Sequence, residues 1–142
     1  DLGKIAIDDS ILRKPGRLTE EEFAVMQTHA LKSGELIEDI LTDVEDPYFV
    51  LVAKNIATYH HEKWNGTGYP EQLKGEEIPL EARIMAIADV YDALVSKRCY
   101  KEPMSVEEAA EVMTESMGNH FDPQMQEVFE KSRKKLEAYY SG

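Results

Sequence analysis

Two adjacent histidines, His60 and His61, are the side chains in this sequence best suited to hold a metal ion. They end a segment with helical apolar spacing and lead directly into the glycine-rich turn at residues 66–70. An α-helix has 3.6 residues per turn, so neighbouring side chains point about 100° apart. One ion would not hold both imidazoles comfortably, whereas two ions about 3.5–4 Å apart could take one each. The pair therefore predicts a site with more than one metal ion.

A carboxylate, Asp89, lies in the middle of the almost entirely apolar stretch from Ile84 to Val95. A helix that is hydrophobic all round is a buried helix, and a lone carboxylate inside it is costly unless it is paired or binds a metal. A hydrogen bond to a neighbouring helix would also satisfy Asp89, but imidazoles in three separate places favour ligation. A set of histidine and carboxylate ligands without thiolate suits Fe, Mn or Zn better than a structural zinc cage.

The remaining histidines and the nearby cations have plainer interpretations. His29 lies on or beside the inward face of a predicted helix, where a histidine is more often a hydrogen-bonded core residue than a ligand. His120 is expected to pack or to cap a turn, so we leave it out of the site. Arg98 and Lys101 would ordinarily be surface cations near a helix C-terminus. One loop away from a metal centre, they become candidate phosphate clamps.

The elements that must position these residues are predicted to be helices. Capping boxes at Thr19 and Ser105 open two of them, and Asp122-Pro123 supplies an N-cap and a first-turn proline for another. Apolar spacing extends the prediction to five helices, at about residues 20–41, 47–61, 80–96, 105–118 and 123–139. Residues 1–18 are expected to be a lead-in and loop, and the long loop at 62–79 to be functional. The sequence predicts one all-α domain over residues 1–142.

Composition narrows the classes of partner. Sixteen basic and 28 acidic residues give a net charge of −12, which argues against binding to nucleic-acid polymers or anionic membranes. A small anionic substrate would need a metal or a local cluster of cations. The single cysteine, Cys99, excludes an internal disulfide and fits a reducing compartment. No apolar run approaches the length of a membrane span, so we expect a cytoplasmic protein with no membrane segment in this chain.

Four segments resemble the signature of HD-GYP domains. They are HHEKWNGTGYP at 60–70, ARI at 82–84, IADVYDAL at 87–94 and HFDP at 120–123. The opening DLGKI, with KPG at 14–16 and LT at 18–19, resembles the segment after the family's first histidine. The resemblance covers nearly the whole chain and implies an HD-domain bundle of about five helices. It also implies a metal-dependent phosphodiesterase that hydrolyses cyclic di-GMP to pGpG and often GMP in bacterial signalling.

The resemblance further implies roles for individual residues. By position, the family's metal ligands fall on Asp1, His29, His60, His61 and Asp89. Catalytic roles fall on Asp1 and Lys4, and Lys4 corresponds to a lysine near the scissile phosphate. Substrate-contacting positions fall on Gly68, Tyr69, Pro70, Arg98 and Lys101. The implied cofactor is two or more divalent ions, with Fe or Mn first and Zn, Mg or Ni as alternatives.

The sequence departs from the family pattern at its first residue. The family pairs a histidine with the aspartate before Leu-Gly-Lys, and this sequence begins at that aspartate, Asp1. We therefore expect an N-terminally incomplete HD-GYP domain with an incomplete metal complement and little activity. Asn65 and Thr67 replace the commoner Asp and Ser of the turn, and Cys99 stands where proline is usual.

Two other functions stay open from the sequence. One is a catalytically weak or inactive module that senses a cyclic dinucleotide or binds other proteins, diguanylate cyclase domains among them. The other is hydrolysis of a different nucleotide or cyclic dinucleotide. A fused receiver or sensor domain and a homodimer are further expectations about partners.

Overall fold

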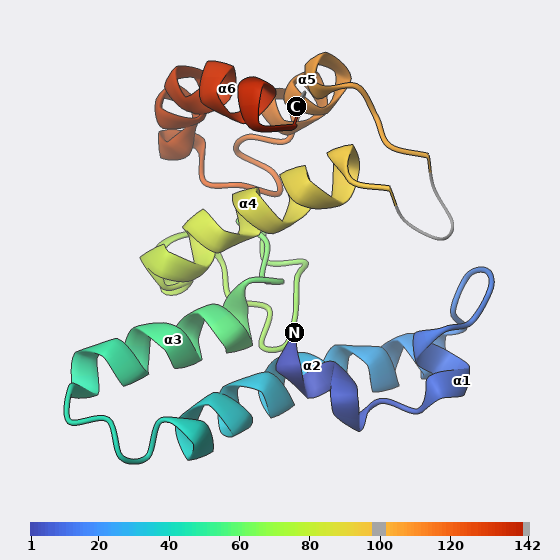
Figure 1. Cartoon of the computed structure of the whole chain (residues 1–142), viewed down its shortest axis with the longest axis vertical. Coiled ribbons are helices and arrows are strands. Elements are labelled where there is room, and N and C mark those ends of the chain that lie inside the picture. The colour runs from blue at the N-terminus through green and yellow to red at the C-terminus, as the bar shows by residue number, and fades with distance from the viewer. Residues whose placement is uncertain (98–101, 141–142) are drawn as a thin grey trace.

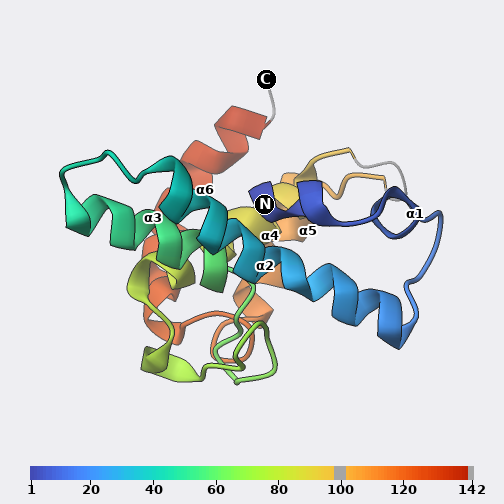
Figure 2. The same ribbon diagram turned by 90° about the horizontal axis from the view of Figure 1, so that it is seen from below.

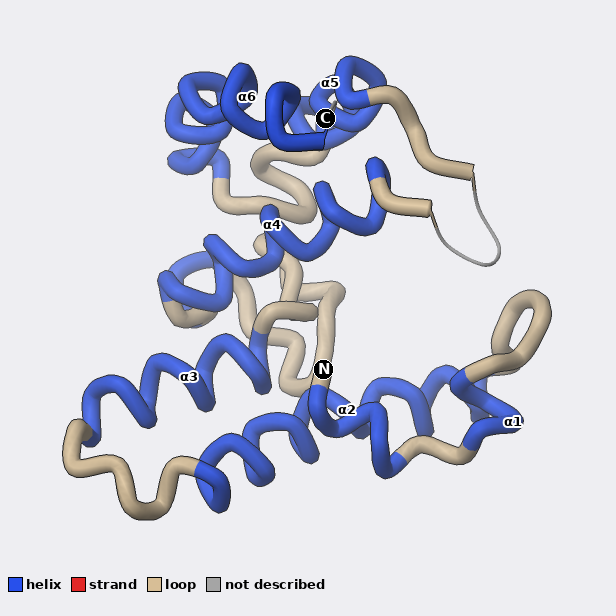
Figure 3. Tube along the Cα trace, viewed as in Figure 1, coloured by secondary structure: helices blue, strands red, loops and turns tan. Residues whose placement is uncertain are grey.

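The computed structural model describes residues 1–97 and 102–140, which form helices joined by loops (Figure 1, Figure 3). The α-helices of this part of the chain are α1 Asp9–Leu12, α2 Glu20–Ile40, α3 Pro47–Tyr59, α4 Leu80–Val95, α5 Val106–Glu115 and α6 Gln126–Tyr140. Short 3-10 helices are η1 Leu2–Ala6, η2 Gly75–Glu77 and η3 Pro123–Met125. None of the described helices combines the length and the apolar character that crossing a bilayer requires. The predicted all-α fold is confirmed.

Local capping explains where the long helices begin. The Thr19 hydroxyl accepts the Glu22 N–H and the Ser105 hydroxyl accepts the Glu108 N–H, so both predicted capping boxes are present. Such caps satisfy backbone donors that the first turn of a helix leaves unpaired. Asp122 caps η3 and not α6, because Pro123 first forms a 3-10 turn. The predicted start of the last helix at residue 123 is therefore wrong by about one turn.

The N-terminal segment differs from its prediction as a loop. Residues 2–6 form η1 and residues 9–12 form α1, which begins where the Asp8 carboxylate accepts the Ser10 N–H. η1 packs along α2, and two perpendicular views show the N-terminus against the middle of the molecule (Figure 1, Figure 2). The chain therefore presents Asp1 to the interior side of α2.

The helices stack in the order of the sequence. α2 packs on α3, α3 on α4, α4 on α5, and α5 on α6. Figure 1 shows α2 at the bottom, then α3 and α4, with α5 and α6 side by side at the top. The cluster of buried apolar residues belongs to the C-terminal half: Ala86, Tyr91, Ala109, Ala110, Met113, Phe121 and Phe129. In the other half α2 and α3 approach closely at Gly34, where an added Cβ would lie 2.1 Å from the Thr58 hydroxyl oxygen.

Helix α4 is less buried than its composition predicted. It packs inward through Ala82, Ala86 and Tyr91, whereas Leu80 and Ile84 are 51% and 52% exposed. On α3, Phe49 is likewise 53% exposed. Apolar character predicts that a residue can be buried, but neighbouring elements decide which faces are covered.

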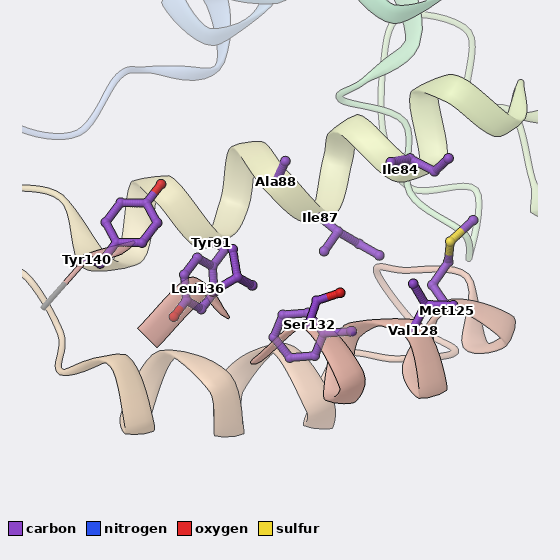
Figure 4. Close-up of a pocket in the computed structure, with 10 residues that line it drawn as sticks. Ile84, Ile87, Ala88, Tyr91, Met125, Val128, Ser132, Leu136 and Tyr140 are labelled. Atoms are coloured by element: carbon purple, nitrogen blue, oxygen red, sulfur yellow. The ribbon is translucent and has the colours of Figure 1, made fainter. Parts of the chain in front are cut away.

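An apolar cavity of about 410 Å³ lies between α4 and α6 (Figure 4). Its lining residues, which include Ile87, Tyr91 and Leu136, contain no histidine and no carboxylate. The Tyr91 hydroxyl is buried without a hydrogen-bond partner. The cavity offers nothing to bind a metal, so the candidate chemistry lies elsewhere.

A partly buried ion pair ties α4 to the turn that precedes α6. Arg83 Nη1 lies 2.8 Å from Asp122 Oδ2, and Arg83 Nε donates to the Ile78 carbonyl at 2.9 Å. The guanidinium also lies 5.9 Å from the centroid of the Trp64 ring. Arg83 thus connects α4 with both ends of the 62–79 loop.

Replacing Arg83 by methionine should lower the free energy of unfolding by about 2–3 kcal/mol, because removing one partner of a buried pair strands the other charge. Asp122 is only 2% exposed, although in the variant its Oδ1 would still accept a hydrogen bond from the Gln124 N–H. Urea denaturation measures the loss. The matched control Arg133→Met removes an i,i+4 ion pair with Glu137. It should lower the free energy of unfolding by only about 0.5 kcal/mol. Equal losses in the two variants would contradict a special role for Arg83.

Candidate metal centre

Three histidines and one carboxylate converge from separate elements. His29 lies in the middle of α2, His60 is the C-cap of α3, His61 follows it, and Asp1 is the N-cap of η1. One ligand atom from each lies within 4.8 Å of all the others. The Nε2 atoms of His29 and His61 are 3.1 Å apart. Asp1 Oδ1 lies 3.2 Å from His29 Nε2, 3.6 Å from His60 Nε2 and 3.7 Å from His61 Nε2.

Backbone carbonyls orient two of the imidazoles. His29 Nδ1 lies 2.5 Å from the Met26 carbonyl oxygen, and His60 Nδ1 lies 2.8 Å from that of Ile56. A carbonyl can only accept, so each Nδ1 carries the proton and each neutral ring presents a lone pair at Nε2. Metal-ligating histidines in proteins commonly make this second hydrogen bond, which fixes the tautomer.

Burial keeps the three rings neutral. His29 is 1% and His60 is 6% exposed, and burial lowers the pKa of both imidazoles. Burial, with His60 and His29 close by, lowers the pKa of His61 to about 3. Neutral imidazole is the form that binds a metal. Lone pairs on His29 and His60 therefore face a carboxylate oxygen of Asp1, an arrangement that a cation at their centre would stabilise.

Asp89 lies beside this cluster and outside its tight set of ligand atoms. It lines a cavity of about 400 Å³ together with Asp1, His60 and Met85. α4 lines both cavities, the apolar one through Ile87 and Tyr91 and this one through Met85 and Asp89. The structure thus places Asp89 at the same cavity as two cluster residues, and its role as a ligand stays a prediction.

Lys4 and Asp1 are held together at the edge of the cluster. Lys4 Nζ donates to Asp1 Oδ2 at 2.7 Å, while Asp1 Oδ1 faces the histidines. The two oxygens of one carboxylate are therefore divided between the cation and the imidazoles. A cationic side chain in this place can offset the charge of an anionic substrate.

The turn at residues 68–70 lies against His61. The Tyr69 ring stacks on the His61 ring with centroids 4.8 Å apart and planes 24° apart, and the Tyr69 N–H donates to the His61 carbonyl. Gly68 permits this contact, because an added Cβ would lie 2.4 Å from the backbone nitrogen of Lys63. Pro70 follows Tyr69 through a cis peptide bond. The predicted phosphate contacts Arg98 and Lys101 lie outside the described residues.

The Tyr69 phenol keeps its proton near pH 7, as an ordinary tyrosine does, and burial raises its pKa further, to about 12. The hydroxyl is therefore neutral near pH 7 and can donate a hydrogen bond. A neutral ring beside neutral imidazoles also adds no charge to the cluster.

Sequence reasoning missed Glu62, the residue directly after the histidine pair. Its carboxylate is 2% exposed and accepts the backbone N–H groups of Glu71 at 2.7 Å and Leu73 at 3.1 Å. These bonds close the 62–79 loop onto the end of α3 and hold the turn beside His61. Burial raises the pKa of Glu62. Its position ahead of a long loop was the only sign, and an exposed glutamate would have looked the same.

A second missed contact places Asp1. The Gly3 N–H donates to the Ser33 hydroxyl at 2.7 Å, which fixes η1 on α2 one turn from His29. A Cβ at Gly3 would lie 2.1 Å from the His29 carbonyl oxygen. The fold and this cluster together define a helical domain whose donors suit a divalent metal ion.

Comparison with known proteins agrees with that class. Residues 1–125 match the family model described as HD domain. The chain therefore belongs to the HD domain family, and its relatives assign it to the HD-GYP branch. Membership of this family implies binding of a divalent metal.

Three relatives come from Vibrio cholerae serotype O1. The protein named "Cyclic di-GMP phosphodiesterase" is 50% identical over 129 residues, which are 91% of this chain and 26% of that protein. The "Probable cyclic di-GMP phosphodiesterase" is 52% identical over 131 residues, or 91% of this chain and 30% of that protein. The "3'3'-cGAMP-specific phosphodiesterase 2" is 46% identical over 128 residues, which are 90% of this chain and 24% of that protein. The chain thus spans between about a quarter and a third of the length of these relatives.

Proposed function

We propose that this domain hydrolyses cyclic di-GMP at a divalent metal centre held by Asp1, His29, His60, His61 and Asp89. The observation that carries the proposal is the mutual approach of electron-pair donors. His29 Nε2, with its proton on Nδ1, lies 3.2 Å from a carboxylate oxygen. Unprotonated donors at this separation repel one another unless a cation lies between them. The relatives whose names state this activity supply the substrate.

The residues around the cluster have separate tasks in such a reaction. A divalent ion at this kind of site supplies polarisation of a phosphate ester and a lowered pKa of water, to about 7. Lys4 supplies positive charge next to Asp1 for the phosphate. Tyr69 holds the plane of the His61 ring by stacking on it. We extend the proposal to two or more ions, with Fe or Mn first, and to phosphate contacts from Arg98 and Lys101.

A second candidate is hydrolysis of another cyclic dinucleotide. One relative, 46% identical to this chain, is named a 3'3'-cGAMP-specific phosphodiesterase. The two substrates share phosphodiester chemistry and differ in one base, so the same metal centre would serve both. A catalytically weak sensor or interaction module is the alternative from a different class. We also propose a cytoplasmic location, a homodimer, and partner domains such as a diguanylate cyclase or a receiver.

The test is a product assay on the protein loaded with Mn²⁺ or Fe²⁺. Cyclic di-GMP should give pGpG or GMP by chromatography, and 3'3'-cGAMP run in parallel decides the second candidate. His61→Ala should reduce turnover by at least about 100-fold and lower the bound metal in elemental analysis, because even loss of an outer contact to a metal ligand costs about 10–100-fold.

The matched control is His120→Ala. Its imidazole stacks on Phe121 and is absent from the cluster, so turnover should stay within about twofold if stability is unchanged. Wild-type activity in His61→Ala would refute the proposed centre. Tight binding of cyclic di-GMP without products would instead support the sensor alternative.

A further inference from the structure

A row of three aromatic rings leads from the metal cluster to the surface. The His61 ring stacks on Tyr69 at 4.8 Å, and the Tyr69 ring meets Phe23 edge to face at 6.0 Å. Tyr69 also makes an edge contact with His29 at 6.2 Å. Phe23 comes from the first turn of α2, while the other two rings come from the loop after α3. The third ring of the row is thus supplied by a different element.

Phe23 is the exposed end of this row. Its side chain is 46% exposed, although it contacts a ring that stacks on a cluster histidine. The planes of Phe23 and Tyr69 are 83° apart, so the two rings form a corner and not a closed stack. Single exposed apolar residues are common on proteins. What distinguishes Phe23 is an exposed aromatic side chain one ring away from the proposed chemistry.

An open aromatic face near a phosphate site suits a nucleobase. A base extends from its phosphate by the length of one sugar, so a nucleotide whose phosphate lies at the cluster carries its base outward. Stacking on an aromatic ring is favourable for every base because it uses the π-face. Stacking of a neutral base is also insensitive to the strongly acidic charge of this chain. The geometry therefore matches a base-binding wall better than another phosphate contact.

We propose that Phe23 is a stacking platform for a purine base of the substrate. The proposal rests on the proposed function for the identity of the nucleotide. It adds a recognition element on α2 to the turn at residues 68–70, with Tyr69 as the ring between the base and the metal ligands. Phe23 is a binding residue here, because it contacts the base and not the reacting atoms.

The test compares a nucleotide with inorganic phosphate, which has neither base nor sugar. Calorimetry on the Mn²⁺-loaded protein gives the Kd of GMP and of inorganic phosphate, whether or not the protein hydrolyses cyclic di-GMP. Phe23→Ala should raise the Kd of GMP by about tenfold, since stacking is worth about 1–3 kcal/mol per base. The Kd of inorganic phosphate should stay unchanged. Phe23→Trp, which keeps a ring, should bind GMP as the unmodified protein does.

Two variants separate stacking from ordinary packing. Phe23→Leu keeps an apolar contact with Tyr69 but has no π-face, so it should lose GMP affinity as Phe23→Ala does. Leu31→Ala removes an apolar side chain of the same helix that is 45% exposed, and it should change the Kd of neither ligand. An unchanged Kd for GMP in Phe23→Ala would overturn the proposal, as would equal weakening of GMP and phosphate. Failure of hydrolysis alone would refute the proposed function and leave this comparison intact.

Discussion

Replacing Gly3 by alanine is expected to abolish metal binding and to reduce phosphodiesterase turnover by at least about 100-fold. The new Cβ would lie 2.1 Å from the His29 carbonyl oxygen and 2.6 Å from the Ser33 backbone nitrogen. Both are atoms of a helix backbone and cannot move aside cheaply. η1 would have to lift from α2, which carries the Asp1 carboxylate away from the three imidazoles. Elemental analysis and the product assay measure the two losses.

Two controls resolve the cause of the Gly3→Ala effect. Ser33→Ala removes only the hydrogen bond to the Gly3 N–H, so it should cost about 1 kcal/mol of stability and keep most of the metal. Gly16→Ala strains a turn with φ of +133° that has no neighbour within 4 Å, so metal content should not change. Full metal content in Gly3→Ala would show that metal binding does not require the close packing of η1 on α2.

Lowering the pH from 7 to 5 is expected to destabilise the metal-free protein by about 4 kcal/mol. Burial lowers the pKa of His61 to about 3 and that of His120 to about 4, below the ordinary value near 6.5. Between these values the unfolded chain binds protons that the folded chain does not, so folding loses free energy as the pH falls. Each group contributes about 2 kcal/mol by pH 5, at 1.36 kcal/mol per pH unit.

Urea denaturation in the presence of a chelator at pH 7, 6 and 5 measures this loss. The lowered pKa values of His29 and His60 act in the same direction. His120→Gln should remove about 2 kcal/mol of the pH-dependent part while leaving the cluster intact. Divalent metal should restore stability at pH 6, because a ligand that binds only the folded state stabilises it. A free energy of unfolding that is constant from pH 7 to 5 would show that the histidines are not buried in neutral form.

The starts of α2, α3 and α5 could be predicted because they depend on neighbouring residues. The hydroxyls of Thr19 and Ser105 bond to backbone groups three residues along, and Pro47 and Asp46 open α3 in the same local way. The short helices of the first twelve residues could not be predicted, since packing on α2 stabilises η1. Short helices have little stability of their own.

Part of the candidate metal site could also be predicted from the sequence, and part depended on the fold. Adjacent histidines ahead of a glycine-rich turn, together with the family resemblance, pointed to His29, His60, His61, Asp89 and Asp1 before any fold was known. The fold brings the first three and Asp1 within reach of one point. It leaves Asp89 at the wall of the neighbouring cavity.

By itself the sequence determined the all-α class, the family and the starts of α2, α3, α4 and α5, and it proposed the candidate metal ligands, because these follow from residue type and short spacing. Only the tertiary structure decided that Glu62 is buried and closes a loop, that Gly3 must lack a side chain, and that Phe23 is open beside Tyr69. Each of these depends on a contact between segments far apart in the chain. A local sequence pattern does not predict such contacts, because the same residue types also occur on exposed surfaces.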